Sequence, residues 1–224
     1  MDKLAFLPLY FVPFIFSLSF HEAAHAWMAD RRGDPTARML GRMTLNPIPH
    51  IDILGTLILP MMSFLTGAPL IGWARPVPVN ERNLRHWRRD GLLVAAAGPL
   101  SNLVLSVAFA GMLAGLSRVN TLFPSAAFVE VTQAGFKVME PLVTMAIVGI
   151  QLNIILAFFN LIPIPPLDGG RVAMSLFPGI ANYLAALERY GIIILWGLLA
   201  FGGLSRVIFQ PAWSLAEILI RWAG

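Results

Sequence analysis

Residues 19–30 read S-F-H-E-A-A-H-A-W-M-A-D and lie at the end of a long apolar run. On a helix that turns about 100° per residue, His21 and His25 project from nearly the same face, so both imidazoles can reach one metal ion. Glu22 lies about a quarter-turn away, where it can contact a water on that metal without binding the ion itself. This spacing predicts the site of a zinc hydrolase on a helix.

The composition places this helix in a membrane. The chain before His21 is apolar back to Leu4, and a helix that spans a bilayer needs about 20 such residues. Of the 224 residues, 57% are hydrophobic and 12% are charged, whereas an ordinary soluble domain has about 25% charged residues. The mean hydropathy is +0.72. We therefore expect an integral membrane protein in contact with the lipid bilayer.

Charge and cysteine content narrow the function classes further. The net charge of +4 would suit nucleic acid, but the basic residues are grouped beside apolar segments, as the positive-inside rule describes for membrane proteins. We therefore expect no nucleic acid partner. The chain has no cysteine, so a metal must be bound by histidine and carboxylate side chains.

The N-terminus permits a second interpretation. Lys3, the apolar run that follows it and the A-A-H-A at residues 23–26 resemble a cleaved signal peptide. However, the residues that follow continue the helical pattern, and His21, Glu22 and His25 would be unusual beside a cleavage site. The sequence therefore favours a membrane-spanning helix.

The apolar segments predict an all-α polytopic membrane protein with about four transmembrane helices. The loops at residues 30–42 and 75–90 hold nine of the sixteen lysines and arginines, so we place both in the cytoplasm. Residues 1–224 are expected to form one membrane-embedded domain, with a catalytic core at about 4–171 and C-terminal helices at 180–224. The predicted spans are 4–29, 92–116, 141–161 and 183–209.

Two shorter elements are predicted on the cytoplasmic side. Residues 51–65 lie between the two cytoplasmic loops and therefore cannot cross the membrane once. Gly55 and Pro60 interrupt this stretch, so we expect a re-entrant element. Residues 73–79 alternate β-branched residues with proline, which predicts a short edge strand.

The remaining segments complete the predicted topology. The loop at residues 117–140 is charge-neutral, as expected on the outer side of the membrane. Pro211 is expected to end the fourth span, and residues 212–223 to form an amphipathic tail at the membrane surface. The fourth span carries no candidate ligand, so it is a candidate gate for substrate.

A catalytic zinc site usually has three protein ligands, so a third must come from elsewhere in the chain. The acidic candidates are Asp52, Asp168 and the loop acids. The first and third spans run in the same direction, which places His21, His25 and Asp168 at similar depth and favours Asp168. Two glycines directly after Asp168 would allow a tight turn there.

Two other polar residues have open roles. His50 either lines the metal cavity or bonds locally to Asp52. Asn102 either stabilises helix packing or contributes to the site, and the sequence favours packing.

Three motifs together resemble the site-2 protease family of intramembrane zinc metalloproteases. They are H-E-A-A-H at residues 21–25, G-P-L-S-N at 98–102 and N-L-I-P-I-P-P-L-D-G-G at 160–170, and they occur in the family's order. The resemblance is to the compact form without PDZ or nucleotide-binding CBS domains, so we expect no regulation by those modules.

This resemblance implies a role for each candidate residue. His21, His25 and Asp168 would bind one Zn²⁺ ion, and Glu22 would be the catalytic base. Asn160 would hold the backbone of the substrate. The implied partners are single-span membrane proteins.

The implied activity is hydrolysis of peptide bonds in transmembrane substrate helices near the cytoplasmic boundary, in regulated intramembrane proteolysis. A helical substrate must unwind locally, and residues 73–79 could hold the extended form by adding it as an edge strand. The expected location is a prokaryotic cytoplasmic membrane, with the active site toward the cytoplasm. The alternatives are an intramembrane metal transporter and a non-catalytic scaffold that binds helices, and the presence of a general base argues against both.

Overall fold

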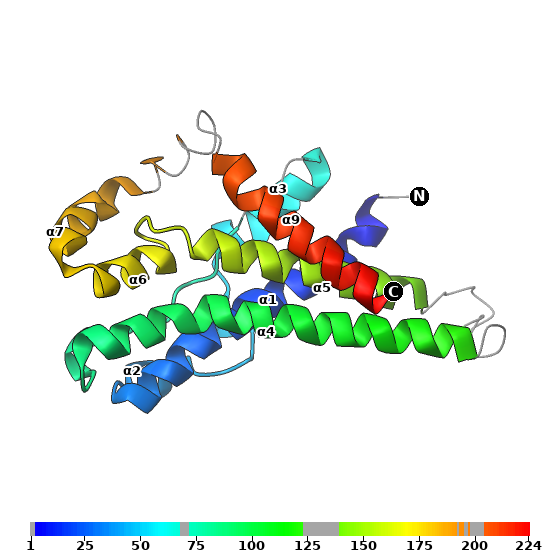
Figure 1. The fold of residues 1–224 in the computed structure, drawn as a ribbon. Helices are drawn as coiled ribbons and strands as arrows, with labels where there is room; N and C mark the ends of the chain where they lie inside the picture. Colours follow the sequence, from blue (N-terminus) through cyan, green and yellow to red (C-terminus); the bar gives the residue numbers. More distant parts are fainter. Residues whose placement is uncertain (1–2, 68–71, 123–138, 192, 195–196, 198–203) are drawn as a thin grey trace.

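Three long helices form the body of the computed structural model, which describes residues 3–67, 72–122, 139–191, 193–194, 197 and 204–224. Helix α1 spans Lys3–Arg32, α4 spans Trp87–Leu122 and α5 spans Met139–Asn160. The three helices pack against one another, and α4 runs antiparallel to α1 and α5 (Figure 1). Residues near the end of α1 and residues near the start of α4 therefore lie at the same end of the bundle.

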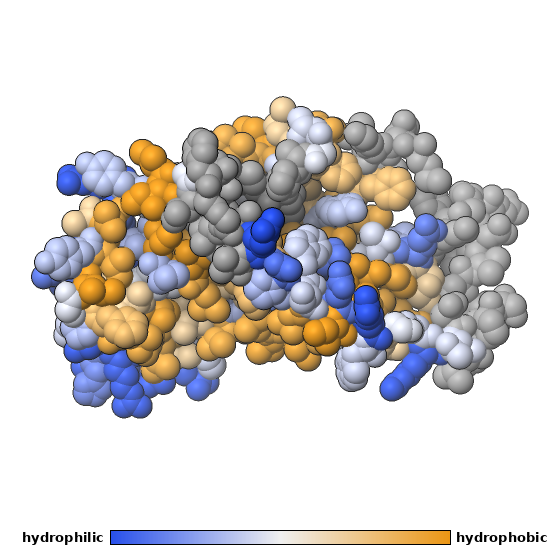
Figure 2. Space-filling view, turned by 45° about the horizontal axis from the view of Figure 1, so that its top comes forward, coloured by the Kyte–Doolittle hydropathy of each residue, from blue (hydrophilic) through white to orange (hydrophobic). Residues whose placement is uncertain are grey.

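All three helices are long and apolar enough to cross a membrane, over Phe6–Arg32, Trp87–Val119 and Met139–Asn160. Figure 2 shows hydrophobic side chains over much of the molecular surface, and many of the hydrophilic ones gather at the end that holds α2 and the start of α4. The first three predicted spans are thus confirmed as helices of spanning length, and the architecture is that of a multi-pass integral membrane protein.

Shorter helices connect and cover these spans. Most of the predicted outer loop lies outside the described residues, because α4 continues to Leu122 and the description resumes at Met139. The shorter elements are α2 (Thr36–Met39), η1 (Ile48–His50), η2 (Ile53–Ile58), α3 (Leu59–Thr66), η3 (Glu81–Asn83), α6 (Asp168–Leu176), α7 (Pro178–Leu187), η4 (Glu188–Tyr190) and α9 (Leu204–Ala223).

The predicted re-entrant segment is helical. The π-helix η2 leads directly into α3, and the carboxylate of Asp52 caps η2 by accepting a hydrogen bond of 2.8 Å from Gly55 N. At 1.5 Å per residue, the helical stretch Ile53–Thr66 is about 21 Å long, which is shorter than the roughly 30 Å hydrocarbon core of a bilayer. It is therefore too short to cross the membrane alone, as the re-entrant prediction requires.

The short edge strand predicted at residues 73–79 is not confirmed, because the structure assigns neither strand nor helix there. The N–H groups of alternate residues in this stretch nevertheless donate hydrogen bonds to neighbouring segments of the protein. Trp73 N donates to Gly55 O at 3.1 Å, and Arg75 N donates to His50 O at 2.8 Å. The loop is thus held to η1 and η2 rather than to a neighbouring strand.

The predicted fourth span at residues 183–209 is not confirmed as one helix. Helix α7 ends at Leu187, and Glu188–Tyr190 form a tighter 3₁₀ turn. Much of the stretch from residue 192 to residue 203 lies outside the described residues. Hydropathy alone did not reveal this tighter turn, because the residues on both sides of it are apolar.

The C-terminal helix also differs from the prediction. Pro211 lies inside α9 and does not end it, and Ala212 and Ala216 are almost fully buried against α4 and α5. Their small side chains allow close approach of the helices, as is typical of packing within membranes. Residues 212–223 are therefore part of the helical core, although Trp213, Ile218 and Trp222 are exposed on the other face.

Asp34 fastens the end of α1 to the loop that leads into α4. One carboxylate oxygen accepts hydrogen bonds from Thr36 N, Thr36 Oγ1 and Asn83 Nδ2, and the other accepts a bond of 2.7 Å from Asn80 N. Burial would raise the pKa of Asp34, but these hydrogen bonds from Thr36, Asn83 and Asn80 lower it below the ordinary value of 3.8. Asp34 therefore stabilises this junction as a carboxylate.

We predict that Asp34→Asn lowers the free energy of unfolding at pH 7 by about 2 kcal/mol, because an amide cannot accept all of these hydrogen bonds. The lowered pKa of Asp34 contributes stability that is complete above its unfolded value of 3.8 and is lost as the pH falls through the folded value. The free energies of unfolding of the protein and of Asp34→Asn, measured in detergent micelles, should therefore differ less at pH 3 than at pH 7. Glu81→Gln, at an exposed carboxylate in η3, is the control and should change little. An equal difference at both pH values would contradict this account.

Candidate metal centre

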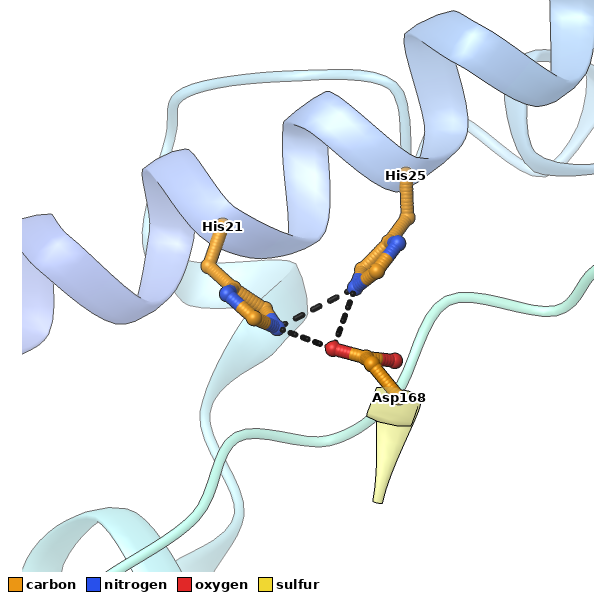
Figure 3. A group of neighbouring side chains, drawn as sticks. All are labelled: His21, His25 and Asp168. Atoms are coloured by element: carbon orange, nitrogen blue, oxygen red, sulfur yellow. Dashed lines mark hydrogen bonds and ion pairs between the residues drawn. The ribbon is translucent and has the colours of Figure 1, made fainter. Parts of the chain in front are cut away.

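Two imidazoles from α1 and one carboxylate from the start of α6 converge on one point (Figure 3). The Nε2 atoms of His21 and His25 lie 3.1 Å apart. Asp168 Oδ2 lies 3.1 Å from His21 Nε2 and 3.2 Å from His25 Nε2. Within the described part of the chain, this is the group of histidine and acidic side chains that could hold a metal ion.

The spacing of these atoms fits a zinc ion. Zinc binds histidine nitrogen and carboxylate oxygen at about 2.0–2.2 Å in a tetrahedral arrangement, which places neighbouring ligand atoms about 3.3 Å apart. Among the described residues, the buried Asp168 Oδ2 has no hydrogen-bond donor, so a cation between the three atoms would satisfy it.

The chain between α5 and α6 brings Asp168 to the histidines. Gly169 and Gly170 form the first turn of α6 and neither has a positive φ, so they do not provide the tight turn that the sequence predicted. Instead they leave room for the preceding loop. A Cβ at Gly170 would lie 2.8 Å from Ile164 C, and a Cβ at Gly169 would overlap the carbonyl groups of Leu161 and Ile162.

Helix α4 approaches the histidine pair closely at Gly98. A Cβ at this position would lie 2.6 Å from His21 Cε1 and would overlap His25 Nε2. The absence of a side chain therefore lets α4 form one wall of the site. The first residue of the G-P-L-S-N motif thus leaves space for the two histidine rings.

The ring of His25 is oriented by the backbone of α4. Its Nδ1 lies 2.7 Å from the carbonyl oxygen of Val94. A carbonyl oxygen only accepts hydrogen bonds, so Nδ1 carries the proton and donates. The neutral ring then presents the lone pair of Nε2 toward Asp168, which is the form that binds a metal.

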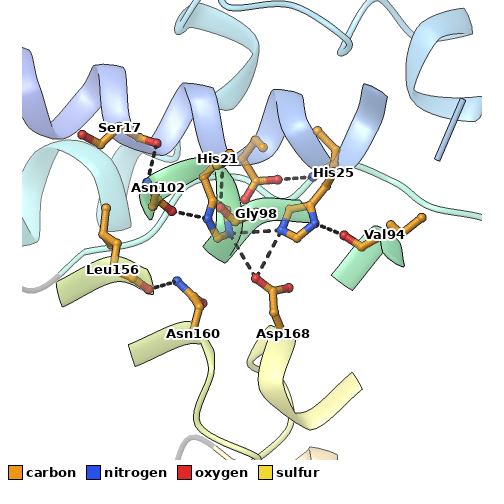
Figure 4. A network of polar contacts seen from close by, with 12 residues as sticks. Ser17, His21, His25, Val94, Gly98, Asn102, Leu156, Asn160 and Asp168 are labelled. Carbon is orange, nitrogen blue, oxygen red and sulfur yellow. Dashed lines mark hydrogen bonds and ion pairs between the residues drawn. The ribbon is translucent and has the colours of Figure 1, made fainter. Parts of the chain in front are cut away.

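The ring of His21 is oriented by Asn102, whose Oδ1 lies 2.6 Å from His21 Nδ1 (Figure 4). The orientation of the amide follows from its other contacts. Asn102 Nδ2 lies 2.7 Å from Asn153 Oδ1 and 3.4 Å from Ser17 O, and a carbonyl oxygen requires a donor. Oδ1 therefore faces His21, so His21 donates from Nδ1 and presents the lone pair of Nε2 to the site.

A second buried amide fixes the first. Asn153 Nδ2 donates to Gly149 O and to Ser17 Oγ, both at 2.8 Å, and Ser17 Oγ donates to Pro13 O at 2.6 Å. Ser17, Asn102 and Asn153 are all fully buried, and they come from α1, α4 and α5. Backbone carbonyls therefore fix the direction of every hydrogen bond in a network that joins three helices and ends on His21.

Glu22 is held by the loop at residues 73–79. Its side chain is buried, and its Oε2 accepts a hydrogen bond of 2.7 Å from Val77 N. This hydrogen bond fixes the Oε2 atom of Glu22, and Val77 N makes no hydrogen bond to Oε1. The loop predicted as an edge strand therefore orients the predicted base.

The other predicted residues make local contacts and are not part of the candidate metal group. Asn160 is the last residue of α5 and donates a hydrogen bond of 2.9 Å to Leu156 O, one turn earlier. His50 is buried and its Nε2 lies 2.9 Å from Thr44 O, so its local bond is not to Asp52. Neither His50 nor Asp52 belongs to the group that could hold a metal.

Sequence reasoning missed several contributors to this site. Val94 and Val77 act through backbone atoms, and side-chain patterns carry no signal for them. Asn102 was assigned to packing, but the structure shows that it packs and also orients His21. The spacing of buried amides at Asn102 and Asn153, within apolar helices, was the signal that could have found the network.

The chain is similar to known proteins over most of its length. Residues 9–202 match Peptidase family M50. The chain is 38% identical to YwhC of Bacillus subtilis, over 94% of this chain and 99% of that protein. It is 32% identical to Rip2 of Mycolicibacterium smegmatis, over 88% of this chain and 68% of that protein. Both relatives carry the name "Putative zinc metalloprotease". No solved structure is significantly similar to the chain.

We predict that Gly98→Ala reduces the zinc content of the purified protein from about one ion per chain to a small fraction of that. The new methyl group must displace His21 or His25, because it would overlap the space between them and α4. Gly111→Ala is the matched control, since a Cβ on that residue of the same helix would meet nothing within 4 Å. Metal analysis by mass spectrometry, with circular dichroism to verify folding, checks both variants. Full zinc content in Gly98→Ala would contradict the close approach of α4.

We also predict that Asn102→Leu weakens zinc binding by about 10- to 100-fold, because His21 loses the acceptor that fixes its tautomer. Competition with a chelator of known affinity measures the change. Ser106→Ala removes another buried polar group of α4, whose Oγ donates to Leu103 O and does not reach the histidines. This control should keep the affinity of the unsubstituted protein. If both variants lost affinity equally, Asn102 would act only through the stability of α4.

Proposed function

The chain belongs to peptidase family M50, and we propose that this zinc metalloprotease hydrolyses peptide bonds of transmembrane substrate helices near the cytoplasmic membrane boundary. The observation that carries the proposal is the convergence of two imidazole nitrogens and one carboxylate oxygen within 3.2 Å of one another, with both histidines on a helix long and apolar enough to span a membrane. In this proposal the protein acts in regulated intramembrane proteolysis.

His21, His25 and Asp168 bind Zn²⁺ in this proposal. The ion, when bound, polarises the substrate carbonyl and lowers the pKa of water toward neutrality. Glu22 accepts the proton of the attacking water and delivers it to the leaving amine. The hydrogen bond from Val77 N to Glu22 Oε2 supports this role, because it fixes the carboxylate in one orientation and leaves Oε1 for proton transfer.

The substrates are single-span membrane proteins, which must unwind locally because helical hydrogen bonds engage their carbonyl groups. In this proposal the loop at residues 73–79 holds the unwound, extended substrate. It does so along its free edge, which is the edge opposite to the N–H groups that bind the protein. The N–H groups of Trp73, Arg75 and Val77 are engaged by the protein, and Pro76 and Pro78 have no N–H group. In an extended chain the opposite edge therefore offers mainly carbonyl oxygens, which accept N–H groups of a peptide. Asn160, the last residue of α5, holds the substrate backbone in this proposal.

The site faces the cytoplasm of a prokaryotic cell in this proposal. The two arginine-rich loops follow α1 and precede α4, so they adjoin the end of the bundle that holds His25 and Val94. Short loops with an excess of arginine lie on the cytoplasmic side of the membrane. A site near that boundary has a short path for the water that hydrolysis consumes.

Substitution of Glu22 by Gln tests the assignment of the base. The amide cannot accept a proton, so we predict that zinc content stays at one ion per chain while cleavage falls by at least about 100-fold. The assay uses proteoliposomes with a set of fluorescently labelled single-span model substrates, and mass spectrometry locates the cleaved bond. Glu81→Gln serves as the control at a carboxylate outside the site. Turnover at the rate of the unsubstituted protein in Glu22→Gln would refute the assignment, and zinc transport without cleavage would identify a transporter instead.

A further inference from the structure

A cavity of about 630 Å³ that is open to the protein surface lies beside the loop that holds Glu22. This volume is within the usual range for pockets that bind small ligands or side chains. Its lining combines two arginines with apolar and proline side chains, and no carboxylate takes part. The lining residues are Leu40, Arg42, Pro49, Arg75, Pro76 and Pro78.

The cavity adjoins the proposed catalytic base. Pro76 and Pro78 line it on either side of Val77, and the backbone N–H of Val77 binds Glu22 Oε2 at 2.7 Å. Successive Cα atoms are only about 3.8 Å apart, so the wall of the cavity lies within one residue of the amide that holds the base. A peptide on the free edge of this loop would therefore place one of its side chains at the cavity.

The two arginines are held together without an acidic partner. Arg42 Nη2 donates a hydrogen bond of 2.7 Å to Arg75 O, which fixes its guanidinium beside the backbone of the second arginine. Burial lowers the pKa of Arg42, and the charge of Arg75 lowers it further, whereas the charge of Glu22 raises it. Over the described ranges, neither arginine forms an ion pair.

Two neighbouring cations in a partly apolar cavity favour an anionic ligand. Arginine presents a planar fork of N–H donors that matches a carboxylate, and both guanidinium groups keep their charge at neutral pH. Arg42 Nε is buried and has no hydrogen-bond acceptor among the described residues, so the donors of this pair are not all satisfied by the protein. A carboxylate in the cavity would balance the repulsion between the two charges.

We propose that this cavity is a substrate subsite that takes an aspartate or glutamate side chain lying within a few residues of the cleaved bond. The inference rests on the proposed function, and it names a specificity that the zinc site alone does not provide. A lipid phosphate is also negatively charged and is the alternative ligand for this cavity. The substrate carboxylate is favoured because Pro76 and Pro78 of the lining flank Val77, whose amide binds Glu22.

Paired substrates test this subsite. Single-span substrates with aspartate or glutamate near the cleaved bond are compared with otherwise identical substrates that carry asparagine or glutamine. We expect kcat/KM to be about 10-fold higher for the acidic member, mainly through a lower KM, because a hydrogen-bonded charge pair is lost in the amide. Arg75→Gln should bring the ratio close to one, and Arg75→Glu should favour substrates with lysine at that position. Arg82→Gln, at an exposed arginine of the same basic loop that does not line the cavity, should keep the ratio.

A binding measurement separates this inference from the proposed function. The Glu22→Gln protein, reconstituted in vesicles of phosphatidylcholine, is titrated with the same fluorescent substrates. Tighter binding of the acidic member supports the subsite even if the unsubstituted protein cleaves nothing, in which case only the proposed function fails. Equal binding of both members overturns the subsite even if cleavage is observed. A requirement for anionic phospholipid that Arg75→Gln abolishes, without any preference among substrates, would assign the cavity to a lipid phosphate and also overturn it.

Discussion

Three lone pairs that converge in an apolar bundle are the constraint on which the rest of the structure depends. The ligand atoms of His21, His25 and Asp168 lie 3.1–3.2 Å apart, and they repel one another unless a cation lies between them. Burying such groups in a membrane protein is costly, so their surroundings must hold them in one form. The hydrogen bonds from both imidazoles to acceptors on α4 meet this requirement, because they keep each proton on the far nitrogen.

Helix packing follows from the same constraint. Helix α4 reaches the histidines at Gly98, and its next turn carries Asn102 to the junction with α1 and α5. The amides of Asn102 and Asn153 join three helices that the bilayer alone would not hold in register, since lipid is as apolar as their outer faces. One polar network thus fixes both the mutual position of the spans and the tautomer of His21.

Much of this arrangement could be predicted from the sequence. The H-E-A-A-H spacing predicted that the two histidines share a helix face, and the parallel direction of the first and third spans placed Asp168 at the same depth. The prediction was wrong about Pro211, because proline is tolerated in packed membrane helices. It also did not find the 3₁₀ turn at Glu188–Tyr190, because hydropathy does not reveal a local change of helix type. It also missed Val77 and Val94, since backbone partners depend on tertiary packing and leave no pattern in the side chains.

The loop after α3 connects the interior of the protein with its outer surface. Within five residues, its amides bind Gly55, His50 and Glu22 in turn, so it joins the helical stretch Ile53–Thr66 to Glu22 on α1. That helix exposes apolar side chains, among them Ile53 and Met62, at the outside of the fold. A displacement of this helix would therefore be transmitted through the backbone of the loop to the amide that holds the Glu22 carboxylate.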